Sequence, residues 1–212
     1  MAVVLLLVTA FSVANVWYWG PGVSGQGMAK VQPVQFTHEH HVGGLGIDCR
    51  YCHFNVERAG LAQVPPTRVC MNCHSQMYTD AQILEPVRES WRSDMPIPWV
   101  KVHNLSDFVY FNHSAHINKG VGCAECHGRV DEMPLMYQAN SLHMSWCLQC
   151  HMDPDKSIRP KSEVTNMNYV NPKNPDAKEI QVAGTTDKKV SQHDLATMYN
   201  VQSKTSCSTC HR

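Results

Sequence analysis

The sequence predicts a mainly α-helical fold with long loops and little sheet, in which one N-terminal transmembrane helix precedes a single extramembrane domain. An uncharged, apolar run covers residues 2–19, which is long enough to cross a bilayer as a helix. All ten cysteines fall in five Cys-x-x-Cys-His motifs, and about 190 residues remain to surround them, or about 38 for each motif. Units of that size rarely fold without a metal or a covalent cross-link. We therefore expect short helices and loops held together at the motifs.

The five motifs have the spacing of covalent c-type haem attachment, in which two thioether bonds hold the porphyrin and the adjacent His binds the iron. Histidine makes up 13 of the 212 residues. Chance would place a His after all five pairs only about once in a million sequences. Zinc knuckles and a disulfide framework are the alternatives, because both also use paired cysteines. We expect five covalent c-type haems on Cys49, Cys52, Cys70, Cys73, Cys123, Cys126, Cys147, Cys150, Cys207 and Cys210, with His53, His74, His127, His151 and His211 as proximal ligands.

The apolar run predicts a membrane anchor over residues 1–20, followed by a Gly-rich linker over 21–34. It ends in the aromatic residues 17–19, which suit the membrane interface, and Gly20 then stops the helix. A cleaved signal peptide is the alternative, with Ser12-Val13-Ala14 as its cleavage site, although no basic residue precedes the run. Haem attachment of this kind takes place on the oxidising side of the membrane. We therefore expect a single-pass protein of the bacterial inner membrane with its haem domain, residues 35–212, in the periplasm.

The haem domain contains an internal repeat. Both units begin with Phe-x-His-x-x-His, followed by one haem motif and then a second, over about residues 36–74 and 111–151, and the fifth motif is appended at 193–212. Between the units, Asp80 to Trp91 predicts a short helix that Asp80 caps, with Ile83, Leu84, Val87 and Trp91 on one face.

Eight histidines remain as candidates for the second axial position of the irons, which favours six-coordinate haems that pass electrons. The two histidines of each Phe-x-His-x-x-His unit share one helical face and can reach two different irons. His40 is expected to face solvent or to support a ligand. The candidate distal ligands are His38, His41, His103, His113 and His116, followed by His143, Met144 and His193.

These units resemble the small class III multihaem cytochromes, in which stacked haems organise the fold. In that family the first His serves the haem of its own motif and the second crosses to another haem. The resemblance implies that His38 serves the first haem and His113 the third, while His41 and His116 cross to neighbours.

The whole chain, most clearly in residues 38–53 and 102–127, is similar to the pentahaem subunit of alternative complex III, a bacterial quinol:electron-acceptor oxidoreductase. That resemblance implies an electron-relay subunit without a catalytic site of its own. It implies as partners an iron–sulfur protein, quinol-binding membrane subunits, a monohaem cytochrome c and the lipid bilayer.

Two other functions compete with the relay. A stand-alone quinol dehydrogenase of the NapC type is compatible with the anchor and the motif count. A catalytic multihaem reductase is disfavoured, because the pentahaem nitrite reductases are far longer and carry a Cys-x-x-Cys-Lys motif that is absent from this sequence. Nucleic-acid binding is not expected, because 18 basic and 18 acidic residues balance and no basic stripe occurs.

Overall fold

A computed structural model describes residues 1–170, 180–181 and 189–211. The predicted mainly helical fold is confirmed in this part of the chain. The α-helices are α1 (Ala2–Trp19), α2 (Pro21–Ser24), α3 (Cys49–Cys52), α4 (Thr67–His74), α5 (Glu85–Ser93), α6 (His113–Ile117), α7 (Cys123–His127), α8 (Met144–Met152), α9 (Gln192–Met198) and α10 (Cys207–Cys210). A π-helix covers Glu39–Gly44, and 3₁₀ turns cover Gln82–Leu84, Val130–Glu132, Pro154–Ser157 and Lys161–Glu163. The strands β1 (Ile180–Gln181) and β2 (Lys189–Val190) pair antiparallel.

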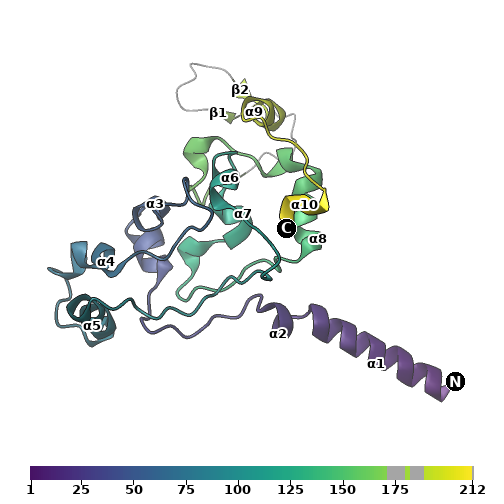
Figure 1. The fold of residues 1–212 in the computed structure, drawn as a ribbon, viewed down its shortest axis with the longest axis horizontal. Helices are drawn as coiled ribbons and strands as arrows, with labels where there is room; N and C mark the ends of the chain where they lie inside the picture. Colours follow the sequence, from purple (N-terminus) through teal and green to yellow (C-terminus); the bar gives the residue numbers. More distant parts are fainter. Residues whose placement is uncertain (171–179, 182–188, 212) are drawn as a thin grey trace.

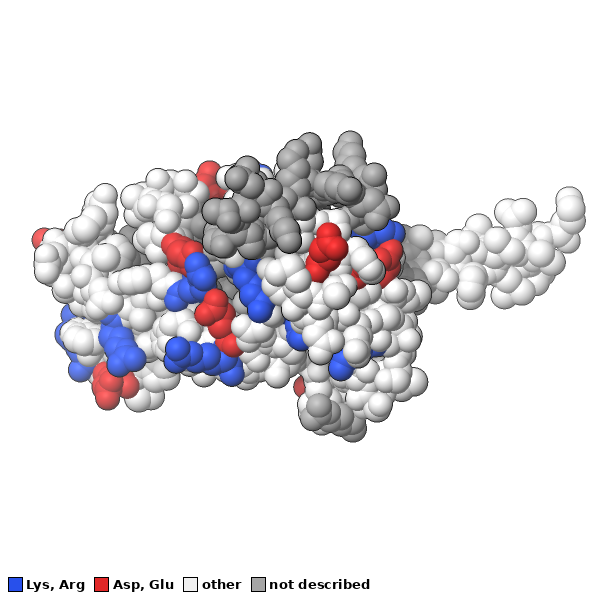
Figure 2. Space-filling model, turned by 90° about the horizontal axis from the view of Figure 1, so that it is seen from above, with Lys and Arg blue, Asp and Glu red and all other residues white. Residues whose placement is uncertain are grey.

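The helix α1 projects away from the rest of the molecule (Figure 1). The side chains of residues 2–18 are exposed, and all but Thr9, Ser12 and Asn15 are apolar or aromatic. The helix is long and apolar enough to cross a membrane. Figure 2 shows no charged residue on it, whereas Lys, Arg, Asp and Glu are interspersed over the neighbouring surface. The helix ends at Trp19 because Gly20 takes an extended conformation and Pro21 begins α2.

The predicted linker over residues 21–34 lies against the rest of the molecule rather than apart from it. The backbone N–H of Gly27 donates to the Gln138 carbonyl (2.8 Å), and Ala29 forms an antiparallel bridge with Tyr137. The Lys30 ammonium donates to the Lys101 carbonyl at 2.7 Å. This segment therefore ties the end of α1 to two parts of the domain.

Buried apolar side chains form two small clusters in the part of the chain that the structure describes. One cluster contains Ile158, Val190, Leu195 and Ala196, and the other contains Val56, Ile117 and Val164. A domain of this length normally buries one continuous core. The apolar protein interior is therefore small, as expected if the motifs themselves are the centre of the fold. The stacking of haems stays a prediction.

The helix predicted from Asp80 to Trp91 is present but begins later. A 3₁₀ turn over Gln82–Leu84 precedes α5, which has Pro86 in its first turn, where a missing N–H costs no helical hydrogen bond. The predicted cap at Asp80 is wrong, since Leu84 precedes the helix and no side chain caps it. The predicted apolar face is wrong in part, because Val87 is buried while Ile83 and Trp91 are 56% and 54% exposed. The 3₁₀ turn rotates Ile83 away from the face that α5 buries.

Candidate haem-binding site

Each of the five motifs lies on a short helix, which brings its two cysteines to the same side. Residues three apart on a helix are neighbours on one face, so both thiols of a Cys-x-x-Cys can meet one porphyrin edge. In α3 the Asp48 side chain starts the turn by accepting from the Arg50 backbone N–H at 2.9 Å. All ten cysteines are free thiols and therefore available for thioether bonds.

The first and third motifs touch through their leading cysteines. The thiols of Cys49 and Cys123 are hydrogen-bond neighbours, and this contact is the main cause of a lowered pKa in Cys49 and a raised pKa in Cys123. The contact joins the two repeated units, since Cys49 belongs to one and Cys123 to the other.

Three further pairs of thiols lie near enough to interact electrostatically, and they place the remaining motifs. In each pair, burial and then the partner thiol raise the pKa of the first cysteine: Cys52 with Cys70, Cys126 with Cys150, and Cys147 with Cys210. The motifs therefore follow one another in the spatial order second, first, third, fourth, fifth. In Figure 1, α4 and α3 lie on the left, α7 lies in the middle, and α8 and α10 lie next to each other on the right.

Three pairs of imidazoles face each other at the separation that one iron requires. Two metal–nitrogen bonds of about 2 Å, together with the radii of two imidazole rings, give a centre-to-centre distance of about 6 Å. The ring centres of His41 and His74 are 6.2 Å apart, those of His113 and His127 are 6.4 Å apart, and those of His116 and His151 are 6.0 Å apart. Each pair combines the proximal His of a motif with a His of a Phe-x-His-x-x-His unit.

The hydrogen bonds of these six rings leave the Nε2 atoms for a metal. In each ring Nδ1 lies within hydrogen-bond distance of a partner, and a ligand His commonly uses its second nitrogen in this way. The Nδ1 partners are Thr37 O for His41, Met77 O for His74, Gly60 O for His113, His103 Nε2 for His127, Asn112 O for His116 and Lys204 O for His151.

For four of these imidazoles the surroundings favour the neutral form, as a metal ligand must be. Burial lowers the pKa of His41, His113 and His116. Burial and then the neighbouring His103 lower the pKa of His127 to about 3. A protonated imidazole has no lone pair for iron, so these low pKa values favour binding of a metal near neutral pH.

The first motif pairs His53 with His38. Burial and then His53 lower the pKa of His38 to about 4, which places the two rings near each other. Nδ1 of His53 lies 2.7 Å from the Gln63 carbonyl, whereas Nδ1 of His38 is buried and has no hydrogen-bond partner among the described residues. By position in the repeat, this pair corresponds to His113 and His127 of the second unit.

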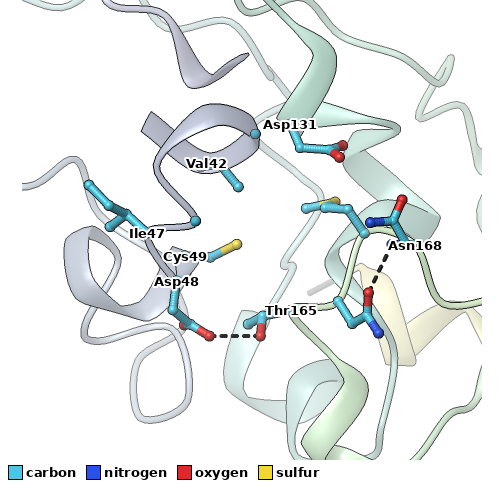
Figure 3. A pocket seen from close by; sticks show the side chains of 11 residues that line it. Val42, Ile47, Asp48, Cys49, Asp131, Thr165 and Asn168 are labelled. Carbon is cyan, nitrogen blue, oxygen red and sulfur yellow. Dashed lines mark hydrogen bonds between the residues drawn. The ribbon is translucent and has the colours of Figure 1, made fainter. Parts of the chain in front are cut away.

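A cavity of about 240 Å³ lies beside the first motif, between residues 42–49 and 165–168. Figure 3 shows the Cys49 sulfur pointing into it, with Asp48 bonded to Thr165 at its rim. Pockets for whole small molecules usually measure about 300–1,000 Å³. The cavity therefore suits the edge of a porphyrin attached at Cys49 rather than a separate ligand.

Zinc fits the described residues less well than haem. No group of three or more His, Cys, Asp or Glu side chains that could hold a metal ion occurs among them. Structural zinc sites need four such ligands around one point. The motifs instead offer two sulfurs on one helical face and opposed imidazole pairs, which is the donor set of a covalently attached haem.

The other predicted ligands lie in different settings. His143 precedes α8, and the adjacent Met144 is 66% exposed. His193 lies on α9 with its Nδ1 2.9 Å from the Asp155 carboxylate. His211 of the fifth motif has its Nδ1 3.2 Å from the Phe108 carbonyl. His40 is exposed, edge-on to His41.

His103 contacts the third motif through Nδ1 of its His127 rather than through Nε2. Its Nε2 lies 3.2 Å from Nδ1 of His127, and the two rings are nearly perpendicular at 79°. Burial and then His113 lower the pKa of His103. The lowered pKa favours a neutral His103, whose Nε2 lies beside Nδ1 of His127.

Sequence reasoning did not assign roles to several residues that support the site. The rings of Phe36 and Phe111 stack on His41 and His116, each with ring centres 4.4 Å apart. The repeat already contained both phenylalanines, so their shared position was the available signal. Buried Arg159 bonds to Glu125 of the third motif at 2.5 Å, a contact across 34 positions that no local pattern predicts.

Comparison with known proteins agrees with this donor set. Over 138 residues the chain is 30% identical to the multihaem cytochrome c subunit of a menaquinone reductase from Nitratidesulfovibrio vulgaris strain Hildenborough. The match covers 65% of this chain and 59% of that protein, so the chain spans well under two thirds of its length. No protein-family model matches the chain. The similarity supports a multihaem cytochrome c with covalently bound haem.

Proposed function

We propose that this protein is a membrane-anchored pentahaem cytochrome c that relays electrons within a quinol oxidoreductase complex of the alternative complex III kind. The proposal rests on one observation: the five motifs lie next to one another in space, in the order second, first, third, fourth, fifth. Haem iron between two imidazoles supplies one-electron transfer and has no open position for substrate.

The axial ligands follow from the imidazole pairs. We assign His38 and His53 to the first haem, His41 and His74 to the second, His113 and His127 to the third, and His116 and His151 to the fourth. The second His of each unit thus crosses from one motif to the next and ties neighbouring haems together. His211 is the proximal ligand of the fifth haem, for which His143, Met144 and His193 stay the candidates for the opposite side.

The membrane setting rests on α1 and on the similar protein. The proposed chain crosses the bacterial inner membrane once, with residues 35–212 on the periplasmic side, where haem is attached. That relative is named as a subunit of a menaquinone reductase, which supports partner subunits that exchange electrons with quinones. The proposed partners are an iron–sulfur protein, quinol-binding membrane subunits and a monohaem cytochrome c.

The same name favours a second candidate, in which electrons flow through this chain toward menaquinone rather than away from quinol. The row of motifs serves either direction. In both cases the quinone site belongs to another subunit, and this chain only conducts.

The test compares the purified, haem-loaded chain with the membrane complex isolated through it. A menaquinol analogue is added to each in detergent, and the reduced haem band is followed. We expect rapid reduction of the complex and none of the isolated chain. Fast reduction of the isolated chain would overturn the relay and favour a NapC-type quinol dehydrogenase. Reoxidation of the pre-reduced complex by a menaquinone analogue then separates the two directions of flow.

A further inference from the structure

The proximal histidine of the third motif has a different hydrogen-bond partner from the other four. In four motifs Nδ1 of this residue lies beside a backbone carbonyl. These pairs are His53 with Gln63, His74 with Met77, His151 with Lys204 and His211 with Phe108. In the third motif the partner of His127 is the imidazole of His103, at 3.2 Å.

Metal binding fixes the direction of this hydrogen bond. Because Nδ1 of His127 lies beside His103, Nε2 is the nitrogen left for iron. Nε2 would then carry the lone pair, so Nδ1 would carry the proton and donate. Nε2 of His103 is then the acceptor, and the proton of His103 is on its own Nδ1. Nε2 of His103 thus accepts the hydrogen bond that a backbone carbonyl oxygen accepts in the other four motifs.

An imidazole nitrogen is a much stronger base than a backbone carbonyl, since its conjugate acid has a pKa of about 6.5. A stronger acceptor draws the Nδ1 proton further from the ligand ring, which raises the basicity of the nitrogen on the metal. A more basic axial ligand favours the oxidised iron and lowers its reduction potential.

We propose that His103 is a positioning residue for the third haem, which holds the His127 ring in place and lowers the reduction potential of that haem. This proposal rests on the proposed haem binding. It replaces the ligand role predicted for His103 from the sequence. The third haem lies in the middle of the row, so every electron that crosses from one repeated unit to the other passes the site that His103 tunes.

The experiment uses the full-length, haem-loaded chain in detergent, with the variants His103→Ala and His103→Gln. The alanine removes the acceptor, and the glutamine supplies an amide oxygen like the carbonyls at the other motifs. His40→Ala is the matched control, because His40 is an exposed imidazole outside the pairs. The five midpoint potentials are measured by potentiometric titration, and low-spin haems are counted by electron paramagnetic resonance.

We expect one of the five midpoint potentials to rise in His103→Ala and to rise less in His103→Gln. Both variants should keep the same number of low-spin haems as the wild type. His40→Ala should leave all midpoints unchanged. Unchanged midpoints in His103→Ala would overturn the proposal. So would the loss of one low-spin haem with a matching gain in carbon monoxide binding, because His103 would then be an iron ligand.

Two controls keep the result interpretable. If His103→Ala is recovered without haem, His103→Gln decides by the same readout, because it retains an acceptor of similar length. The haem content of the wild type is measured first. A wild type without covalent haem would refute the proposed function, whereas a haem-loaded wild type with unmoved potentials in both variants would refute only the role of His103.

Discussion

The two repeated units place the same rings in almost the same geometry. Phe36 lies 4.9 Å from His38 at 88°, and Phe111 lies 4.8 Å from His113 at 89°. The stacked rings that follow have centres 4.4 Å apart at 27° in the first unit and 26° in the second. These angles and distances are set within a stretch of six residues. The geometry of the distal ligands is therefore a local property of Phe-x-His-x-x-His.

The surroundings of the two units differ much more than the rings do. The first unit continues into a π-helix over Glu39–Gly44 without buried residues, and the second forms α6, which buries Ile117. Nδ1 of His38 lacks a hydrogen-bond partner among the described residues, whereas Nδ1 of His113 lies 3.0 Å from the Gly60 carbonyl. The repeat therefore places the candidate ligands, while residues outside it set the surroundings of each motif.

Removal of a crossing histidine should have the largest effect and should be equal in the two units. His41→Ala and His116→Ala each take one imidazole from a facing pair and leave one iron five-coordinate. We expect each variant to bind one more equivalent of carbon monoxide than the wild type after reduction with dithionite, measured by difference spectroscopy. The ring centres of the two pairs are 6.2 and 6.0 Å apart, so the gain in carbon monoxide binding should be the same in both units.

The control for this prediction is His40→Ala, which should bind no more carbon monoxide than the wild type. A gain in only one of the two ligand variants would show that the units differ in ligand set as well as in surroundings. No gain in either would contradict the assignment of both crossing histidines.

The ion pairs of the two units should contribute different amounts to the free energy of unfolding. In the first unit Arg50 contacts Asp48 at 2.9 Å with both side chains over 40% exposed. In the second, Glu125 is 31% exposed and contacts Arg159, which follows the unit in sequence and is 2% exposed. We expect Arg50→Ala to cost at most about 1 kcal/mol of unfolding free energy. Arg159→Ala should cost about 3 kcal/mol, at the lower end for a buried pair because water still reaches Glu125.

Urea unfolding of the haem-loaded chain, followed by circular dichroism, measures both costs. The double variant Arg159→Met with Glu125→Gln should recover much of the loss, because it removes the carboxylate together with its cation. Equal costs for Arg50→Ala and Arg159→Ala would show that burial does not distinguish the two units.

Features that depend on a few neighbouring residues could be predicted from the sequence. The helix over Ala2–Trp19, its end at Gly20 and the two Phe-x-His-x-x-His units all follow from local patterns. The late start of α5 was not predicted, because Asp80 competes as a cap with Pro86, whose fixed φ suits the first turn.

Contacts between distant residues could not be predicted, since no local pattern specifies them. His103 and His127 are 24 positions apart, and nothing near either residue distinguishes a hydrogen-bond partner from an iron ligand. The hydrogen bonds from imidazoles to the carbonyls of Gly60 and Gln63 could not be predicted either. Every residue type has a backbone carbonyl, so only the path of the chain decides which carbonyl meets an imidazole.

The smallest predicted effect concerns the residue between the Phe and the first His of each unit. The Thr37 hydroxyl accepts from the His40 backbone N–H, and the Asn112 side chain accepts from the Ala115 backbone N–H, both at 3.3 Å. Such caps are worth about 1 kcal/mol, somewhat more for Asn than for Thr. We expect Thr37→Ala to cost slightly less stability than Asn112→Ala in the same urea titration.

Neither cap variant should change the ligands, because the imidazoles of His41 and His116 bond to the backbone carbonyls of Thr37 and Asn112, which alanine retains. Carbon monoxide binding should therefore stay at the wild-type level in both. If Asn112→Ala gained an equivalent and Thr37→Ala did not, the ligand geometry of the second unit would depend on its cap. The similar ring geometry of the two units would then have different causes. The backbone path would set it in the first unit, and the Asn112 side chain would set it in the second.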